Sequence, residues 1–424
     1  MKYLFVACLL CLSVLSAVAK VPAMNKIRLT NNWEYLKGDL GGIWEAVRPA
    51  APGSSEAVPI WQPVTLPHCF NAEDAVDPDV NYYEGPGWYK TLLAIDNPYR
   101  NGRIVLDFDG AGQKTDVYVY TTHVGSHVGG YDSWNVDITD AVKAFLGSKD
   151  AERFKGKVPL SIRCDNSRDL EMIPSDLADF NIYGGLYRYL NLVYLPEVSF
   201  EQIRLESSLS SNLKEGILKV KTSFYNPEDI RKADVTVSVY DVDRKPVFSK
   251  TLEGILPLGD QLLAKMKIKN PVLWDVDVPQ LYTCELTVKT PDQTFTTEER
   301  FGFRHTEFKD KGPFFLNGKR LLLRGTHRHE DHAGVAQAMT EDMMRREMRM
   351  MKDMGVNFIR LGHYQQSEII LDLCDELGIL VWEEIPWCRG GLGGDVYKEQ
   401  ARRMLANMIV QHHNHPAVII WGLG

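Results

Sequence analysis

The chain has 424 residues, of which 44% are hydrophobic and 25% are charged, and its formal net charge is −8. This length and apolar content are sufficient for two or three domains with buried cores. The acidic balance and the lack of a basic run argue against nucleic acid as a partner.

The first 19 residues have the pattern of a secretory signal peptide. Lys2 precedes an apolar core over residues 3–14, and small residues at 17–19 form a cleavage site. The apolar core is too short for a convincing membrane span, and no other stretch of the sequence could cross a membrane. We therefore expect residues 1–19 to be removed and the protein to be secreted or periplasmic.

Residues 20–197 show short runs of alternating polar and apolar residues between turn signals, which is typical of an all-β domain. The expected strands cover residues 88–94, 104–108, 115–120 and 158–165. A stretch rich in Pro, Gly, Ser and Ala at 47–63 is interpreted as an exposed connection.

Residues 198–305 form a second unit with the same two-residue period, at 235–239 and 281–288. Its size and pattern predict an immunoglobulin-like β-sandwich. It carries no cluster of catalytic residue types, so we expect a structural role.

Residues 306–424 alternate between apolar strands and amphipathic helices, which predicts a parallel sheet covered by helices. The expected strands are 321–326, 357–361, 379–383 and 417–423. Thr340 and Ser367 have the positions of helix N-caps, and Gly355 and Gly378 follow the ends of the same two helices. The pattern corresponds to the first half of a (β/α)8 barrel.

Polar residues gather where these strands end. His329 follows the first strand, Arg360 and His363 end the second, and Glu384 ends the third. Because barrel chemistry sits at the C-terminal ends of the strands, we expect these side chains to converge on one mouth. His327, His329, Glu330 and His332 could suggest a metal site such as one for zinc, but three ligands on one short segment do not easily close a tetrahedral shell. We expect no metal.

Five cysteines follow the signal peptide, and they are odd in number and widely spaced. A disulfide framework is therefore not expected, even in an oxidising compartment. They are Cys69, Cys164, Cys284, Cys374 and Cys388.

Four motifs in the last third carry a family resemblance: FFLNGKRLLLRGTHRHEDH, NFIRLGHY, LCDELGILVWEE and NHPAVIIWGLG. They resemble the barrel signatures of glycoside hydrolase family 2. LPHCFN, YYEGPGWYK, RCDNS and IYGGLYRYLNLV resemble segments of that family's jelly-roll sugar-binding domain. The resemblance implies a jelly roll, an immunoglobulin-like sandwich and a TIM barrel, of which residues 306–424 would be the N-terminal half.

The resemblance also implies a substrate site. Asp179 matches a sugar-contacting Asp of the jelly roll, His329 and His363 match sugar contacts of the first subsite, and Arg360 matches an arginine that braces the carboxylates. Glu384 lies near this site. In the family the fourth strand continues into an Asn-Glu pair whose Glu is the acid/base catalyst. We expect that Glu directly after Gly424, so this chain holds no catalytic residue and is expected to be inactive alone.

The implied activity is retaining exo-hydrolysis of terminal β-linked sugars, with β-galactosidase-type specificity as the main expectation. A β-glucuronidase-type enzyme and a non-catalytic carbohydrate-binding remnant are the alternatives. The magnesium-ligating Glu-Thr-His-Gly run of metal-dependent β-galactosidases is replaced here by Glu384-Ile385-Pro386-Trp387. We therefore expect a carbohydrate partner and no cofactor. The sequence leaves open whether the protein forms a homo-oligomer.

Overall fold

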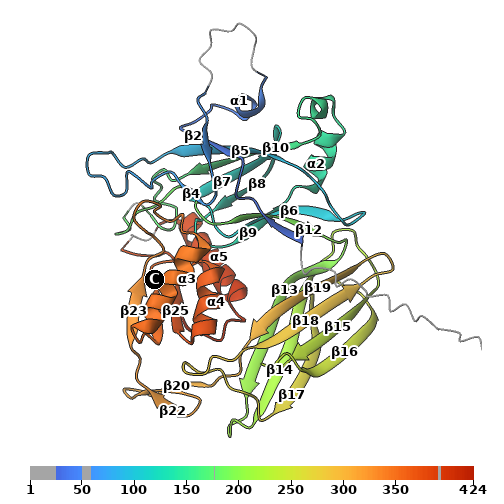
Figure 1. Ribbon diagram of the computed structural model, residues 1–424, viewed down its shortest axis with the longest axis vertical. Coiled ribbons are helices and arrows are strands. Elements are labelled where there is room, and N and C mark those ends of the chain that lie inside the picture. The colour runs from blue at the N-terminus through green and yellow to red at the C-terminus, as the bar shows by residue number, and fades with distance from the viewer. Residues whose placement is uncertain (1–24, 50–58, 176, 390–392) are drawn as a thin grey trace, which may run out of the picture.

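The computed structural model describes residues 25–49, 59–175, 177–389 and 393–424, and the expected signal peptide lies outside them. Figure 1 shows two β domains and an α/β unit, with the second β domain lying beside the α/β unit and the first covering one end of it. Within the described residues, no helix has the length and apolar character needed to cross a membrane.

The first domain consists of two antiparallel sheets that enclose one core. The inner residues include Trp33, Tyr89 and Leu106, all essentially without solvent exposure. The smaller sheet has the order β1 (Asn25–Arg28), β12 (Leu190–Leu195), β6 (Arg103–Phe108) and β9 (Trp134–Asp137). The larger sheet has the order β3 (Gln62–Val64), β2 (Trp33–Lys37), β5 (Pro86–Leu93), β10 (Val158–Asp165), β7 (Lys114–Val119) and β8 (Thr122–Val128). The four strands expected from the sequence match β5, β6, β7 and β10 to within about a residue or two.

Shorter elements surround these sheets. They are α1 (Trp44–Val47), α2 (Thr139–Leu146), the 3-10 helix Lys149–Glu152, and the small pair β4 (His68–Cys69) and β11 (Gly185–Leu186).

The second domain is a sandwich of a three-stranded and a four-stranded sheet. Buried and partly exposed residues alternate along β14, because successive side chains of a strand point to opposite faces. One sheet contains β13 (Ser199–Leu209), β14 (Glu215–Tyr225) and β17 (Asp260–Lys269). The other contains β16 (Pro246–Ile255), β15 (Ala233–Tyr240), β18 (Tyr282–Lys289) and β19 (Thr294–Phe301).

The α/β unit has a parallel four-stranded sheet. Its order is β23 (Gly325–Arg328), β24 (Phe358–Leu361), β25 (Leu380–Glu384) and β26 (Val418–Gly422), with helices α3 (Glu341–Asp353), α4 (Glu368–Leu377) and α5 (Asp395–Gln411) between them. The expected caps are present: the Thr340 and Ser367 side chains accept hydrogen bonds from backbone N–H groups of α3 and α4, and Gly378 ends α4 with φ +67°. The fold expected from the sequence, including half of a TIM barrel, is confirmed.

The first barrel strand begins later than the sequence predicted. Residues 319–321 belong to β22 (Lys319–Leu321), which pairs with β21 (Phe314–Leu316), and β21 also pairs with β20 (Thr306–Phe308). Asn317 and Gly318 both have positive φ, at 52° and 76°, and join β21 to β22. An Asn-Gly pair strongly favours a two-residue hairpin. This local hairpin takes up Leu321, the first residue of the expected barrel strand.

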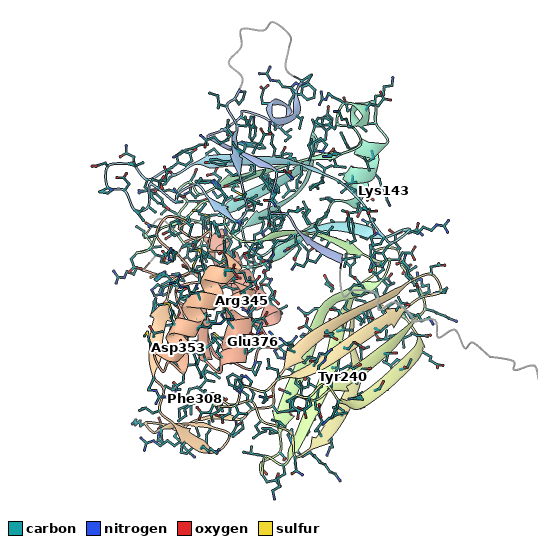
Figure 2. All side chains as sticks on the ribbon, in the orientation of Figure 1. Lys143, Tyr240, Phe308, Arg345, Asp353 and Glu376 are labelled. Carbon is teal, nitrogen blue, oxygen red and sulfur yellow. The ribbon has the colours of Figure 1, made fainter. Side chains whose placement is uncertain are left out.

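Charged side chains on the outside of the half barrel connect it to the sandwich. Arg345 of α3 and Glu376 of α4 face each other in Figure 2, with Arg345 Nη1 3.9 Å from Glu376 Oε2. Arg300 of β19 donates to Glu376 at 2.8 Å and to Asp372 at 2.6 Å. The sandwich is thereby held against α4.

Candidate functional site

Three imidazoles meet at the C-terminal ends of the first two barrel strands. The ring of His327 lies 5.1 Å from those of both His329 and His363, and the rings of His329 and His363 lie 5.4 Å apart. The parallel register places His327 beside Arg360, so side chains from separate strands share one edge of the sheet. The expected convergence on one mouth is observed.

Glu384 lies beneath these rings. Arg360 donates to it through Nη2 at 2.6 Å and Nε at 3.2 Å, and Nδ1 of His363 lies 3.0 Å from the same carboxylate. The Glu384 side chain has no solvent exposure. Its contacts in the described residues are those of a group that holds Arg360 and His363 in place.

Glu383 points to the opposite side of β25, as adjacent strand residues must. Its carboxylate lies 2.7 Å from Nδ1 of His412 and accepts a hydrogen bond from the Gln366 backbone N–H at 3.3 Å. Glu383 is fully buried there. The two neighbouring carboxylates therefore do not form a pair.

The imidazoles of the first strand are held neutral. Burial, together with neighbouring His329 and Arg360, lowers the pKa of His327 to about 4. Burial also lowers the pKa of His329, and the nearby Asp331 offsets this only in part. A neutral imidazole has one donor and one acceptor nitrogen, which suits hydrogen bonding to hydroxyl groups.

The first domain completes the mouth with residues 179 and 180. Phe180 lies nearly parallel to the His363 ring, with centroids 6.0 Å apart, and its ring is 5.7 Å from that of His329. Asp179 accepts a hydrogen bond from the Cys388 thiol at 2.9 Å and forms an ion pair with Arg389 at 2.9 Å. The Cys388 hydrogen bond and the Arg389 charge hold the pKa of Asp179 below its usual value.

Phe180 and Cys388 were missed by the sequence reasoning. Neither belongs to a recognisable motif pattern, although Phe180 directly follows Asp179 and Cys388 follows the end of the third strand. Only these adjacencies could have suggested them.

A buried ion pair fixes the first domain behind the mouth. Arg188 donates to Glu330 through Nε at 3.0 Å and Nη2 at 3.3 Å, and both residues are at most 4% exposed. Glu330 also accepts from the backbone N–H of Ser367 at 2.8 Å, and the Tyr131 and Tyr364 rings stack at 4.1 Å nearby. His329 is thus attached to a rigid support.

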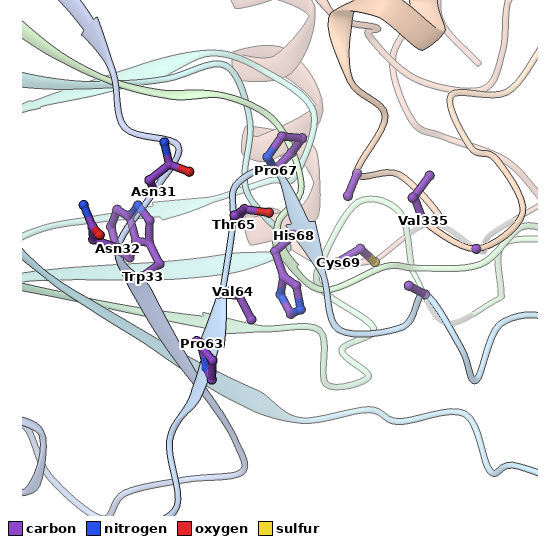
Figure 3. Close-up of a pocket in the computed structure, with 13 residues that line it drawn as sticks. Asn31, Asn32, Trp33, Pro63, Val64, Thr65, Pro67, His68, Cys69 and Val335 are labelled. Carbon is purple, nitrogen blue, oxygen red and sulfur yellow. The ribbon is translucent and has the colours of Figure 1, made fainter.

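A separate cavity of about 800 Å³ lies between the first domain and the loop that follows His332 (Figure 3). Its wall includes His68, whose Nδ1 is 2.8 Å from the Tyr89 hydroxyl. Burial lowers the pKa of His68 to about 4. The lining residues are Asn31, Asn32, Trp33, Pro63, Val64, Thr65, Pro67, His68, Cys69, Ala72, Gly334, Val335 and Ala338, none of them a residue of the mouth.

Three sets of side chains in the described part of the chain bring metal-ligand atoms within 4.8 Å of one another. Two of them share His363 and lie in the mouth. The third lies between α4 and the start of β26. The sets are His327, His329 and His363; Asp179, His363 and Cys388; and Asp372, Asp375 and His415.

A jelly roll and a half barrel that share a polar mouth, with a sandwich beside the half barrel, define a multidomain protein of the glycosidase type. Family models agree along the chain: glycosyl hydrolases family 2, sugar binding domain, matches residues 40–196; glycosyl hydrolases family 2 matches 198–304; and its TIM barrel domain matches 307–424. The chain belongs to glycosyl hydrolase family 2.

Relatives extend this finding. The crystal structure of Parabacteroides merdae β-glucuronidase is 99% identical, with a TM-score of 0.93, over 94% of this chain and 50% of that chain. A β-glucuronidase of Bacteroides fragilis is 32% identical over 85% of this chain and 52% of its own length. A β-galactosidase of Thermoanaerobacter pseudethanolicus is 28% identical over 92% of this chain and 50% of its own length. The chain spans about half the length of the relatives it matches.

These comparisons favour the β-glucuronidase alternative over the β-galactosidase-type specificity that was the main expectation from the sequence. The barrel motifs behind that expectation are shared by both branches of the family. They define the strand ends of the mouth and carry little information on the sugar.

Proposed function

We propose that this chain provides the sugar-binding part of a retaining exo-β-glycosidase of β-glucuronidase type. The observation that carries the proposal is the 99% identity, over 94% of this chain, to a solved β-glucuronidase. The neutral imidazoles of the mouth support the same reading, because a terminal sugar presents several hydroxyl groups to them.

Five residues of the mouth have roles in this proposal. His329 and His363 hydrogen-bond to hydroxyls of the terminal sugar, and Asp179 binds the sugar from the jelly-roll side. Arg360 Nη2 donates to Oε1 of Glu384 at 2.6 Å and lies 3.0 Å from Nδ1 of His363. Arg360 thereby helps to keep His363 in place. Fixed donors and acceptors favour the transition state because they need no reorganisation during the reaction.

The reaction itself requires two carboxyl groups about 5 Å apart, one as nucleophile and one as acid/base. Glu384 is engaged with Arg360 and His363, and Glu383 faces His412 on the other side of the strand. The proposal therefore assigns both catalytic carboxylates to the part of the relatives' length that this chain does not span.

The test uses an extended protein, defined as residues from 20 onward continued through the full length of these relatives. It is assayed with 4-nitrophenyl β-D-glucuronide and 4-nitrophenyl β-D-galactoside. We expect kcat/KM for the glucuronide to exceed that for the galactoside by at least ~100-fold, because a site that pairs with a polar group discriminates strongly against an analogue that lacks it. A preference for the galactoside would contradict the specificity, and no turnover of either would favour the carbohydrate-binding alternative.

We also propose that the protein is exported, on the basis of the signal pattern in residues 1–19. N-terminal sequencing of the mature protein is expected to begin at Lys20. An intact residue 1 in the purified native protein would contradict export by this route.

A further inference from the structure

The thiol of Cys388 lies at the edge of the mouth, near a carboxylate and an imidazole, two groups that commonly act as metal ligands. The Sγ atom of Cys388 is 2.9 Å from Oδ1 of Asp179, and ligand atoms of these two residues and His363 all lie within 4.8 Å of one another. The three residues come from the jelly roll, the end of β24 and the segment after β25. Chain segments that are distant in sequence thus supply ligands from different directions.

We propose that Asp179, His363 and Cys388 form a binding site for Zn²⁺, and that zinc at this site blocks entry of the sugar. The first half of the inference stands on the geometry alone. The second half, inhibition, rests on the function proposed above, because His363 would serve both the metal and the sugar.

The ligand types select the class of metal. Thiolate, imidazole and carboxylate are the three protein ligand types of tetrahedral zinc sites, and three protein ligands leave a fourth position for water. Magnesium and calcium prefer oxygen ligands only, so the thiol and the imidazole disfavour them. Zinc bonds are about 2.0–2.3 Å long, so the three ligand atoms would rearrange around the ion on binding, and Cys388 Sγ and Asp179 Oδ1 would move apart from their 2.9 Å contact.

The surroundings of His363 match those of a metal-bound histidine. Its Nδ1 lies 3.0 Å from Oε1 of Glu384, which is fully buried. A histidine that binds a metal commonly donates its other ring N–H to a carboxylate, which fixes the tautomer and raises the basicity of the ligating nitrogen. Arg360 Nη2 also lies 3.0 Å from Nδ1. Zinc at Nε2 would require the tautomer in which Nδ1–H donates to Glu384, and Arg360 Nη2 would then donate to Glu384 alone.

The two other sets differ from this one in charge. Three imidazoles can also hold zinc with one open position, but His327, His329 and His363 supply no negative charge to offset the ion, and the Arg360 guanidinium lies 3.3 Å from His327 Nδ1 and 3.0 Å from His363 Nδ1. In the third set, His415 already forms a 2.6 Å contact with Asp375. Burial lowers the pKa of His415, but Asp375, Asp372 and Glu368 together raise it to about 9. A metal there would have to displace a firmly held proton. For the set that contains Cys388 to bind zinc, the thiol must lose its proton and Arg389 must release Asp179.

The experiment titrates the extended protein with Co²⁺ as a spectroscopic substitute and with Zn²⁺ by calorimetry. The wild type is expected to show a thiolate-to-cobalt charge-transfer band in the near ultraviolet. Cys388→Ser should lose this band and raise the Kd for zinc by at least ~10-fold, since even outer contacts of metal ligands change affinity by this amount. His327→Gln, which removes a ligand of the neighbouring three-histidine set only, is the matched control and should keep the band.

Absence of the band in the wild type would overturn the site, and so would a band that survives in Cys388→Ser. Circular dichroism and Tm verify that both variants are folded. Asp179→Asn is a second test variant, expected to weaken zinc binding while the band remains.

Inhibition is measured separately, with each variant compared to its own rate in the presence of a chelator. Zinc is expected to inhibit glucuronide hydrolysis by the wild type, with an at least ~10-fold higher midpoint for Cys388→Ser. Unchanged rates at saturating zinc would overturn the blocking claim while the site stands. An inactive extended protein that shows the cobalt band would overturn the proposed function and leave the metal site supported.

Discussion

His363 is held from two sides at the mouth of the half barrel. Its Nδ1 lies 3.0 Å from both Glu384 and Arg360, and the Phe180 ring lies almost parallel to its own at 6.0 Å. A side chain restrained in this way presents its remaining nitrogen in one direction. Such preorganisation is what a sugar-binding group needs, because no ordering remains to be done when the substrate arrives.

The first prediction concerns this residue in the extended protein. His363→Ala should lower kcat/KM for the preferred glycoside by roughly 10²-fold or more, because hydrogen bonds to sugar hydroxyls strengthen in the transition state. The control is His332→Ala, an exposed histidine whose Nδ1 lies 2.9 Å from the neighbouring Ala333 carbonyl. Steady-state kinetics and Tm provide the readout. Unchanged kinetics in a folded His363→Ala variant would assign this residue a structural role only.

At the scale of elements, the segment before β26 is joined to α4 by a charged pair. Nδ1 of His415 lies 2.6 Å from Asp375 Oδ2, and Oδ1 of Asp375 accepts from the Ala417 backbone N–H at 2.9 Å. Burial disfavours the charged ring, but the charge and hydrogen bond of Asp375, together with the nearby Asp372 and Glu368, outweigh it and raise the pKa of His415 to about 9. The last strand of the sheet is therefore anchored through a protonated histidine.

The second prediction is the pH dependence of this anchor. The folded pKa lies above the unfolded value of about 6.5, so the folded state binds more protons between these values and stability falls as pH rises. The contribution should be complete below about pH 6.5 and lost through pH 9, with a size of roughly 1–3 kcal/mol. Asp375→Asn retains an acceptor for Ala417 and should flatten the profile. Urea midpoints from pH 6 to 9.5 provide the measurement, and parallel profiles for the two proteins would contradict the assignment.

At the scale of the whole molecule, a buried and an exposed ion pair both join the jelly roll to the half barrel. Arg188 and Glu330 are at most 4% exposed. The side chains of Arg28 and Glu341 are 44% and 29% exposed, and Arg28 Nη1 lies 3.0 Å from Glu341 Oε2. Breaking a buried pair leaves an uncompensated charge away from water, but an exposed pair exchanges its partner for water.

The third prediction follows from this contrast. Glu330→Ala in the extended protein should lower the free energy of unfolding by about 3–5 kcal/mol, and Arg28→Gln by no more than about 1 kcal/mol. Urea denaturation followed by tryptophan fluorescence compares the two variants under the same conditions. Equal losses in both would mean that burial of the Arg188 pair does not control domain docking.

The fourth prediction is that a polypeptide of residues 20–424 will not hydrolyse glycosides. The retaining mechanism needs two carboxylates about 5 Å apart, and Glu383 and Glu384 point to opposite sides of β25 with other partners. In this polypeptide β26 would also be an edge strand, which favours aggregation. Hydrolysis assays and light scattering compare the polypeptide with the extended protein. Comparable turnover by both would contradict the mechanism.

Much of the architecture was predictable because its determinants are local in sequence. Thr340 and Ser367 cap the helices that they precede, and Gly378 ends α4 in the left-handed region, since such contacts span only a few residues. The start of the first barrel strand was predicted wrongly because another local signal, a turn, was overlooked. Its apolar residues gave a strand signal, but the Asn317-Gly318 turn directed part of them into a hairpin.

The arrangement of the mouth was likewise predictable in part and dependent on tertiary packing in part. The strand-end rule for barrels was sufficient to bring His329, His363 and Glu384 together, because parallel strands place their C-terminal ends on one edge. The contact between Asp179 and Cys388 joins residues 209 positions apart, and it exists because the jelly roll docks on the half barrel, with the Arg188–Glu330 pair among the docking contacts. Whether Glu384 faces solvent or lies buried beneath Arg360 also depends on packing from several elements at once. Sequence alone therefore determined the elements and the edge on which the site lies, and only the tertiary structure decided which side chains surround His363.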